Sequence, residues 1–177
     1  MGGLHHISLL RRSASEFSAL VSALPGIRMN FMPLAASPKC YLDDLVVYKT
    51  MTVEQWIEQA ARQLDVDGLE FYWGFVPHED GTALQRIRQL VEAHGLTLPM
   101  MCYSSDFTKL DASERAEEIH RQTRAIEVTA ALGGKFCRVL SGQRRPEVAQ
   151  DDGVKMAADC INSLIPFAQT CGVTLVL

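Results

Sequence analysis

Four glycines, each placed just before an apolar segment, set a repeating pattern along this chain. They are Gly68, Gly95, Gly134 and Gly172, and successive members lie 27, 39 and 38 residues apart. Each interval holds an apolar strand-like run, a polar loop and an amphipathic helix-like run, and the next glycine is placed to end that helix. Each interval is therefore one strand–helix unit, which predicts an α/β fold built on parallel strands.

Helix signals agree with this pattern. Thr52 and Gln55 have the spacing of a capping box and predict a helix start. The apolar residues that follow share one helical stripe: Val53, Trp56, Ile57, Ala60, Ala61 and Leu64. Further helices are predicted over residues 82–94, from Asp111 to Gly133, and from Asp151 to Gly172, with a kink at Pro166.

The predicted strands are apolar almost throughout and do not alternate with polar residues. They read "NFMPLAAS", "DGLEFYW", "LTLPMMCYS", "KFCRVLS" and "VTLVL". Continuous apolar runs are typical of parallel strands covered on both faces. About four βα units and a fifth parallel strand are expected over residues 31–177, with no second domain.

Two architectures fit this order of elements. One is a five-stranded doubly wound sheet, and the other is a partial (β/α)8 barrel. A doubly wound nucleotide-binding sheet usually carries a glycine-rich loop after its first strand. The corresponding segment here, "SPKCYLDDLVVYKT", contains no glycine, which weakens the nucleotide-binding interpretation.

Composition excludes several classes of partner. The formal net charge of −4 gives no general attraction to nucleic acid or anionic membrane, and no apolar run approaches the ~20 residues of a membrane helix. The five cysteines include no C-x-x-C pair, so we expect reduced, buried thiols in a cytoplasmic protein.

Residues 1–30 differ from the rest and are interpreted as an N-terminal extension of uncertain status. Arg11 and Arg12 make a twin-arginine export signal conceivable. Glu16 interrupts the following apolar stretch, which disfavours that alternative. Met29 or Met32 could be the natural start instead.

Candidate functional residues lie just past the carboxyl ends of the predicted strands, where both architectures place their sites. Glu70 is the catalytic candidate, with a structural ion pair as its alternative. Asp106 either reaches substrate or bonds its own backbone in a turn. Arg138 lies inside an apolar strand, so we expect it to pair with an acid such as Glu70 or to contact an anionic group.

The other strand-end candidates would bind a hydroxylated or anionic ligand. Gln143, Arg144 and Arg145 could form an anion clamp or a solvated loop. Trp73 and Phe75 could form an apolar wall or ordinary packing. The complete set expected to bind substrate is Lys39, Tyr72, Ser104, Asp106, Arg138, Ser141, Gln143 and Arg144.

Several of these segments resemble the sugar phosphate isomerase/epimerase family of xylose isomerase-like TIM barrels. The resemblance runs from about Met32 to Leu177 and is most specific in "YSSDFT" and "CRVLSGQRRPE". Ser104-Ser105 stands where the family pattern leads us to expect Ser-Pro, a departure that affects the stiffness of the loop.

The resemblance implies isomerisation or epimerisation of a small sugar, polyol or sugar phosphate by an enzyme that uses a divalent metal (Mn, Mg or Zn). It places the metal ligands after strands five to eight, beyond Leu177, so no metal ligand is expected among these residues. We expect residues 31–177 to be the N-terminal portion of the barrel, truncated after strand five and inactive alone.

Two alternatives stay open. A non-catalytic half-barrel would expose its edges and associate with a partner or with itself. A zinc phosphodiesterase acting on abasic DNA shares the barrel type but needs several histidines at early strand ends, where His78 stands alone.

Overall fold

The strands of the sheet follow one another in chain order, and all of them are parallel. The computed structural model describes residues 32–177, so the expectations for residues 1–30 lie outside the described part. β1 (Ala35–Ala36) pairs with β2 (Gly68–Leu69). A second set runs in the order β3 (Phe71–Tyr72), β4 (Met100–Cys102), β5 (Phe136–Arg138) and β6 (Thr174–Val176).

β2 and β3 are the two parts of one predicted strand, separated by Glu70. The backbone N–H of Glu70 donates to the carbonyl oxygen of Ala36 at 2.8 Å, and the N–H of Leu69 donates to that of Thr97 at 2.8 Å. These bonds, with the parallel bridge between Gly68 and Thr97, link the two sets of strands. The sheet therefore has five successive positions.

This unreversed order decides between the two predicted architectures. A doubly wound sheet reverses its strand order at a switch point, whereas a barrel adds each new strand beside the previous one. The observed order is that of a barrel, so the α/β fold is a partial (β/α)8 barrel of about four βα units and a fifth parallel strand.

The helices begin and end close to their sequence signals. The 3-10 helix η1 (Lys39–Tyr41) leads into α2 (Leu42–Val46), and α3 (Val53–Gln63) follows the Thr52 capping box, in which both reciprocal hydrogen bonds are present. After β3 come η2 (Trp73–Phe75), α4 (Gly81–Ala93), α5 (Ala112–Ala131) and α6 (Gln150–Thr170). Pro166 lies inside α6, and the kink remains a prediction.

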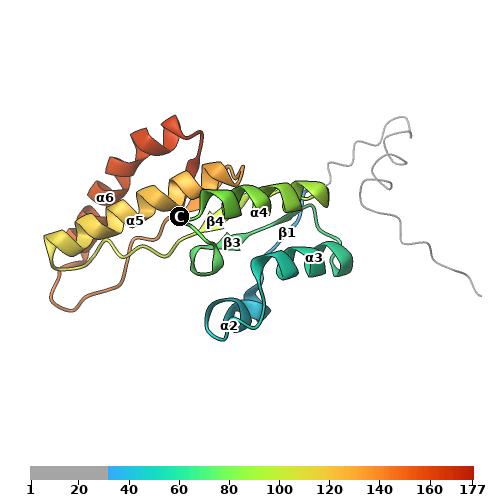
Figure 1. Ribbon diagram of the computed structural model, residues 1–177. Helices are drawn as coiled ribbons and strands as arrows, with labels where there is room; N and C mark the ends of the chain where they lie inside the picture. The colour runs from blue at the N-terminus through green and yellow to red at the C-terminus, as the bar shows by residue number, and fades with distance from the viewer. Residues whose placement is uncertain (1–31) are drawn as a thin grey trace, which may run out of the picture. The chain divides into compact units, whose positions relative to one another are not determined.

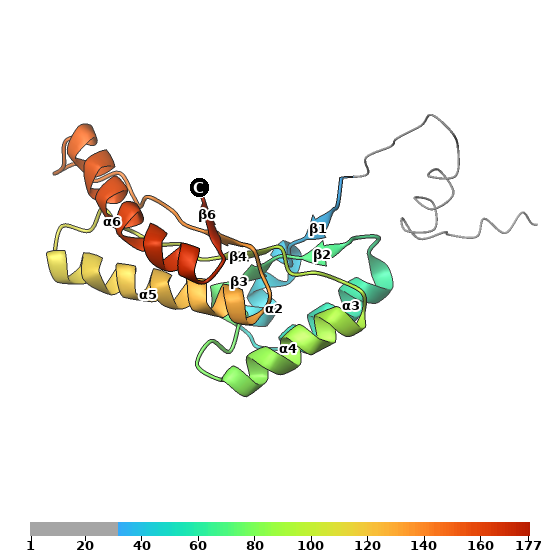
Figure 2. The same ribbon diagram turned by 90° about the horizontal axis from the view of Figure 1, so that it is seen from above.

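Residues Leu34–Leu177 form one compact unit in which the helices pack on the strands. Figure 1 labels the helices from α2 to α6 along the chain, and Figure 2 shows α3, α4 and α5 on the same side of the strands. α3 contacts α4, and α4 contacts α5. Ile57, Phe71 and Ile87 belong to one buried cluster, and Phe107 and Leu164 belong to a second. Between residues 32 and 177 no helix is long and apolar enough to cross a membrane.

The cysteines are free thiols, but their predicted burial holds only in part. Cys137 and Cys160 are buried, whereas Cys102 and Cys171 are partly exposed. Cys40 is exposed, because it lies in the short η1 turn past β1 and not in the body of a strand.

Candidate functional site

One row of side chains crosses the sheet on the face opposite the helices. The strand register aligns Tyr72 with Cys102, Cys102 with Arg138, and Arg138 with Val176. Residues one position earlier, such as Phe71 and Met101, are buried in the core under the helices. Because successive side chains on a strand point to opposite faces, the row around Arg138 lies on the inner face of the partial barrel.

A pocket of about 230 Å³ opens at the carboxyl ends of these strands. The structure brings four of the predicted site residues together in its wall, namely Lys39, Tyr72, Ser104 and Arg138. These residues follow β1, end β3, follow β4 and end β5, so the pocket lies where a barrel places its active site. We call it the mouth pocket.

Four further residues of the mouth pocket were not among the predicted site residues: Ser37, Pro38, Leu42 and Cys102. Cys102 could have been found from the period of two that separates it from Ser104 on the same inner face. Burial raises the pKa of the Cys102 thiol, the nearby Arg138 guanidinium lowers it, and the Glu70 carboxylate raises it, with a raised pKa as the result. The thiol is therefore protonated at neutral pH and is a poor nucleophile there.

Arg138 does not form the ion pair that we expected from the sequence. One terminal nitrogen, Nη2, donates to the Ser104 hydroxyl at 3.0 Å. No acidic oxygen of residues 32–177, Glu70 included, forms an ion pair with it within 4.0 Å. The Nε atom of Arg138 is buried and has no hydrogen-bond partner in the described part of the chain. The prediction of a structural ion pair between Arg138 and Glu70 is therefore wrong.

Glu70 lies beside the mouth pocket and not in its wall. It comes two residues before Tyr72 on the same strand, and its carboxylate is close enough to Cys102 to raise the pKa of that thiol. Two residues is one inward-facing step along a strand, so Glu70 lies deeper in the barrel than Tyr72. This position allows a role in acid/base chemistry, which stays a prediction.

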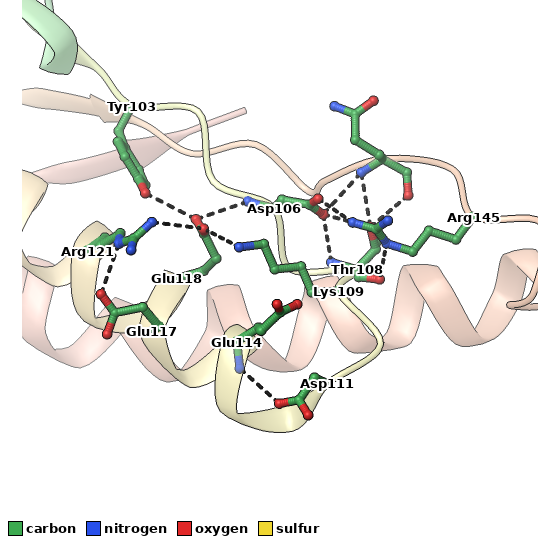
Figure 3. A network of polar contacts seen from close by, with 11 residues as sticks. Tyr103, Asp106, Thr108, Lys109, Asp111, Glu114, Glu117, Glu118, Arg121 and Arg145 are labelled. Atoms are coloured by element: carbon green, nitrogen blue, oxygen red, sulfur yellow. Dashed lines mark hydrogen bonds and ion pairs between the residues drawn. The ribbon is translucent and has the colours of Figure 1, made fainter.

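The loop after β4 is held by a network of polar contacts centred on Asp106 and Glu118 (Figure 3). Oδ1 of Asp106 accepts hydrogen bonds from the Thr108 hydroxyl at 2.8 Å and the Thr108 N–H at 3.2 Å. Oδ2 pairs with Arg145 at 2.5 Å. Gly142, at φ +122, approaches Asp106 so closely that a Cβ there would collide with the carboxylate.

These contacts agree with the second interpretation of Asp106 from the sequence, a residue that stabilises a turn through bonds to nearby backbone. Burial by itself raises the pKa of Asp106, but hydrogen bonds from Thr108 and Gln143 and the charge of Arg145 outweigh it and hold that pKa below its ordinary value. Arg145 is accordingly part of this loop structure and not a solvated side chain.

Glu118, on α5, is a buried carboxylate that the sequence analysis missed. It accepts hydrogen bonds from the Tyr103 hydroxyl at 3.1 Å and the Asp106 N–H at 3.4 Å, and it pairs with Lys109 at 2.9 Å (Figure 3). Burial alone raises its pKa, but the hydrogen bonds from Lys109 and Tyr103 bring it below the ordinary value. The sequence hinted at this burial only by placing a charged residue on the apolar side of a predicted helix.

The remaining predicted residues line a different cavity. Ser141, Gln143 and Arg144 belong to the wall of a pocket of about 260 Å³ between the loop after β5 and the first turns of α6. Nη1 of Arg144 donates to the carbonyl oxygens of Arg145 and Val148 at 2.5 and 2.6 Å. These three residues are therefore separated from the mouth pocket, where they were expected to join Lys39.

Trp73, Phe75 and His78 follow β3 and lie outside the wall of the mouth pocket. Trp73 stacks on His78 with ring centroids 3.9 Å apart, and it meets Tyr103 edge to face at 5.6 Å. Phe75 packs on Phe71 at 5.6 Å. The structure therefore places both predicted wall residues in ordinary packing.

The described residues do not form a metal centre. Among residues 32–177 there is no group of three or more His, Cys, Asp or Glu side chains that could hold a metal ion. The mouth pocket offers a thiol, hydroxyls and cationic groups, and this donor set does not suit a divalent cation that prefers carboxylate oxygens or imidazole.

A family model described as a xylose isomerase-like TIM barrel matches residues 58–177. The chain belongs to this xylose isomerase-like family. The match covers the strand positions from β2 to β6 and agrees with the unreversed strand order.

Solved structures share the xylose isomerase-like fold at low sequence identity. D-psicose 3-epimerase from Clostridium cellulolyticum H10, solved with D-tagatose, is 14% identical with a TM-score of 0.66, over 81% of this chain and 51% of that one. An L-ribulose 3-epimerase is 18% identical with a TM-score of 0.66, over 83% of this chain and 49% of that one. IolI with a bound zinc atom is 16% identical with a TM-score of 0.65, over 82% of this chain and 51% of that one.

The chain thus spans about half the length of these structures. The comparison with curated proteins found no match.

Proposed function

We propose that residues 32–177 form the substrate-binding half of a sugar isomerase or epimerase. The observation that carries the proposal is that residues from four successive strand ends, Lys39, Tyr72, Ser104 and Arg138, line one pocket at the mouth of a xylose isomerase-like barrel. Barrels of this kind place their active sites at that end. Three relatives of known structure are sugar epimerases by name, which supports a sugar as the substrate.

The chemistry that we propose is proton transfer at the carbon next to a carbonyl group. A base removes that proton and leaves an enediolate. Return of a proton to the other face of the same carbon gives the epimer. Return to the neighbouring carbon, with transfer of the hydroxyl proton from one oxygen to the other, gives the isomer. Glu70 is the acid/base candidate, because its carboxylate lies beside the mouth pocket and forms no ion pair within residues 32–177.

Tyr72 and Ser104 are proposed to hold the sugar. Both residues belong to the wall of the mouth pocket, and each side chain carries a hydroxyl group that can donate and accept a hydrogen bond. Arg138 orients Ser104 through its Nη2 hydrogen bond. We also propose a divalent metal in the complete enzyme, held by ligands outside residues 32–177. The zinc in the IolI structure supports this.

Ligand-observed NMR tests the proposal. Saturation transfer from the protein should reach D-fructose, D-tagatose and D-psicose, and Tyr72→Phe with Ser104→Ala should weaken it. Glu147→Gln, an exposed change outside the mouth pocket, is the matched control. Equal transfer in all variants, or none to any ketose, would contradict the proposal. We expect no deuterium incorporation into these sugars in D₂O by the chain alone.

A second candidate function is association through the open edge of the sheet. An apolar groove of about 350 Å³ lies beside β6, where Val139, Ile165, Leu175 and Leu177 contribute to its wall. An uncovered strand edge beside apolar surface favours pairing with another chain. Sedimentation velocity should then show concentration-dependent dimers, and a monomer at every concentration would exclude this alternative.

A further inference from the structure

Ser104 lies beyond the last paired residues of β4 and β5, so the ladder of the sheet does not fix its position. The register of these two strands ends with Cys102 opposite Arg138. Within residues 32–177, the next backbone-to-backbone hydrogen bond between the two segments runs from the Phe107 N–H to the carbonyl oxygen of Ser141 at 3.2 Å. The stretch between these points carries the proposed sugar-binding hydroxyl, and it needs another support.

The hydroxyl group of Ser105 supplies that support. Its Oγ donates to the carbonyl oxygen of Leu140 at 2.8 Å and accepts from the N–H of the same residue at 3.0 Å. A hydroxyl can do both, because it has one donor and two acceptor lone pairs. Ser105 is only 3% exposed, so water competes little for these bonds. One side chain thus takes the place of a ladder bond and ties the loop after β4 to the end of β5.

The two neighbouring serines hold this loop at two points. The hydroxyl of Ser104, an exposed residue, accepts from Nη2 of Arg138 at 3.0 Å, and Ser105 binds Leu140, two residues further along. One contact alone would allow the dipeptide to pivot, whereas two contacts fix its direction. Ser105 does not belong to the wall of the mouth pocket, whereas Ser104 does. An effect of Ser105 on a ligand there must therefore pass through Ser104.

Thr108 makes an equivalent pair of contacts outside the mouth pocket. Its hydroxyl lies 2.7 Å from the carbonyl oxygen of Gln143 and accepts from the N–H of Gln143 at 3.0 Å. Thr108 is buried, as Ser105 is, but it belongs to the wall of the cavity beside α6. The chain therefore offers two buried hydroxyls that bind a facing backbone in the same way, and the one on Ser105 adjoins a residue of the mouth pocket.

We propose that Ser105 is a positioning residue of the mouth pocket, whose bonds to Leu140 hold the Ser104 hydroxyl where it meets Arg138 and the ligand. This inference rests on the proposed function, because Ser104 is the proposed sugar-binding residue through which Ser105 acts. Ser105 itself binds no ligand. Without its hydroxyl, the N–H and carbonyl groups of Leu140 lose their partner, and Ser104 is free to turn away from the pocket.

A spectroscopic signature of the Ser104–Arg138 contact is the first test. The Nε–H signal of Arg138 in ¹⁵N NMR spectra reports on the guanidinium that Ser104 binds, and burial of this nitrogen slows exchange of its proton with water. Ser105→Ala should move the signal to the position that it takes in Ser104→Ala. Adding Ser105→Ala to Ser104→Ala should move it no further, because substitutions that act through one contact are not additive.

Ketose affinity is the second test, measured by titrating the 177-residue chain with D-fructose, D-tagatose and D-psicose. Ser105→Ala and Ser104→Ala should each weaken binding about fivefold, since a neutral hydrogen bond is worth about that factor. The double variant should bind as weakly as Ser104→Ala alone. Thr108→Val is the matched control: it removes the equivalent hydroxyl at nearly constant size and should leave both the Arg138 signal and the affinity at their wild-type values. Urea unfolding of Ser105→Ala and Thr108→Val compares their stabilities.

The outcomes separate the positioning role from the function on which it rests. An unmoved Arg138 signal in Ser105→Ala overturns the role, as do equal losses of ketose affinity in Ser105→Ala and Thr108→Val, or a further fivefold loss in the double variant. A wild-type chain that binds none of the three ketoses overturns the proposed function. The Arg138 signal then decides by itself whether Ser105 holds Ser104 in place.

Discussion

Replacing Glu118 with glutamine removes one charge from the network that holds the loop carrying Ser104 and Asp106. The change keeps the size of the side chain, which is only 6% exposed. Its amide can still accept from the Tyr103 hydroxyl, but its NH₂ group would face Lys109 as a donor facing a donor. The expected result is a less stable fold and a looser loop.

The loss follows from the value of a charged acceptor in a buried position. A hydrogen bond to a charged group contributes about 1.5–3 kcal/mol, so Glu118→Gln should lower the free energy of unfolding by about 2 kcal/mol. With a urea m-value of about 2 kcal/mol per M, the midpoint of urea unfolding should fall by roughly 1 M. Circular dichroism at 222 nm follows the transition.

Glu117→Gln is the matched control, because Glu117 precedes Glu118 on α5 and its side chain is 51% exposed in its pair with Arg121. Exposed pairs of this spacing contribute little, so the control should unfold at nearly the wild-type urea concentration. Equal midpoints for the two variants at pH 7 would refute the reasoning.

The acid dependence gives a second check. The pKa of Glu118 is lower in the folded protein than its ordinary value of 4.5. The stabilisation is therefore fully present above about pH 5 and is lost as the pH falls through the folded pKa. The difference between wild type and Glu118→Gln should shrink over that acid range, and a constant difference would show that the charge is not its source.

Two other substitutions test the environment of this loop and the core beneath the sheet. Burial and the negative charge of Glu118 raise the pKa of Tyr103 to about 12. Tyr103→Phe should therefore remove the part of the tyrosinate absorbance at 295 nm that appears at the highest pH. An unchanged titration curve would contradict this. The stabilisation from a raised tyrosine pKa is present below pH 10 and is lost toward pH 12, so wild type should lose stability over that range while Tyr103→Phe loses less. Ile57 is fully buried, and Ile57→Ala should lower the free energy of unfolding by about 2–5 kcal/mol, measured by urea unfolding, with a loss below 1 kcal/mol arguing against a packed core.

Local sequence signals predicted the elements of this fold because their causes are local. The Thr52–Gln55 capping box and the aspartate at residue 111 each start a helix through contacts within three residues. The split of one predicted strand at Glu70 was missed, since it depends on which neighbouring backbone each half meets.

The structure brings only some of the predicted site residues together, and the division follows the path of the loops. Lys39, Tyr72, Ser104 and Arg138 meet in one pocket, because parallel strands bring their carboxyl ends to one edge. Ser141, Gln143 and Arg144 were expected with them but line another cavity. Asp106 binds Arg145 and lies against Gly142, both more than thirty residues away in sequence. These contacts hold the loop after β5 away from the mouth pocket.

The sequence by itself determined the alternation of strands and helices, their parallel direction and the strand ends at which the candidate site lies, since these follow from apolar periodicity, caps and glycines. Tertiary structure alone decided the strand order, the absence of an ion pair between Glu70 and Arg138 within residues 32–177, and the burial of Glu118. These features depend on register and on the packing of side chains distant in the chain, because a carboxylate and a guanidinium pair only where the folded backbone brings their atoms within reach.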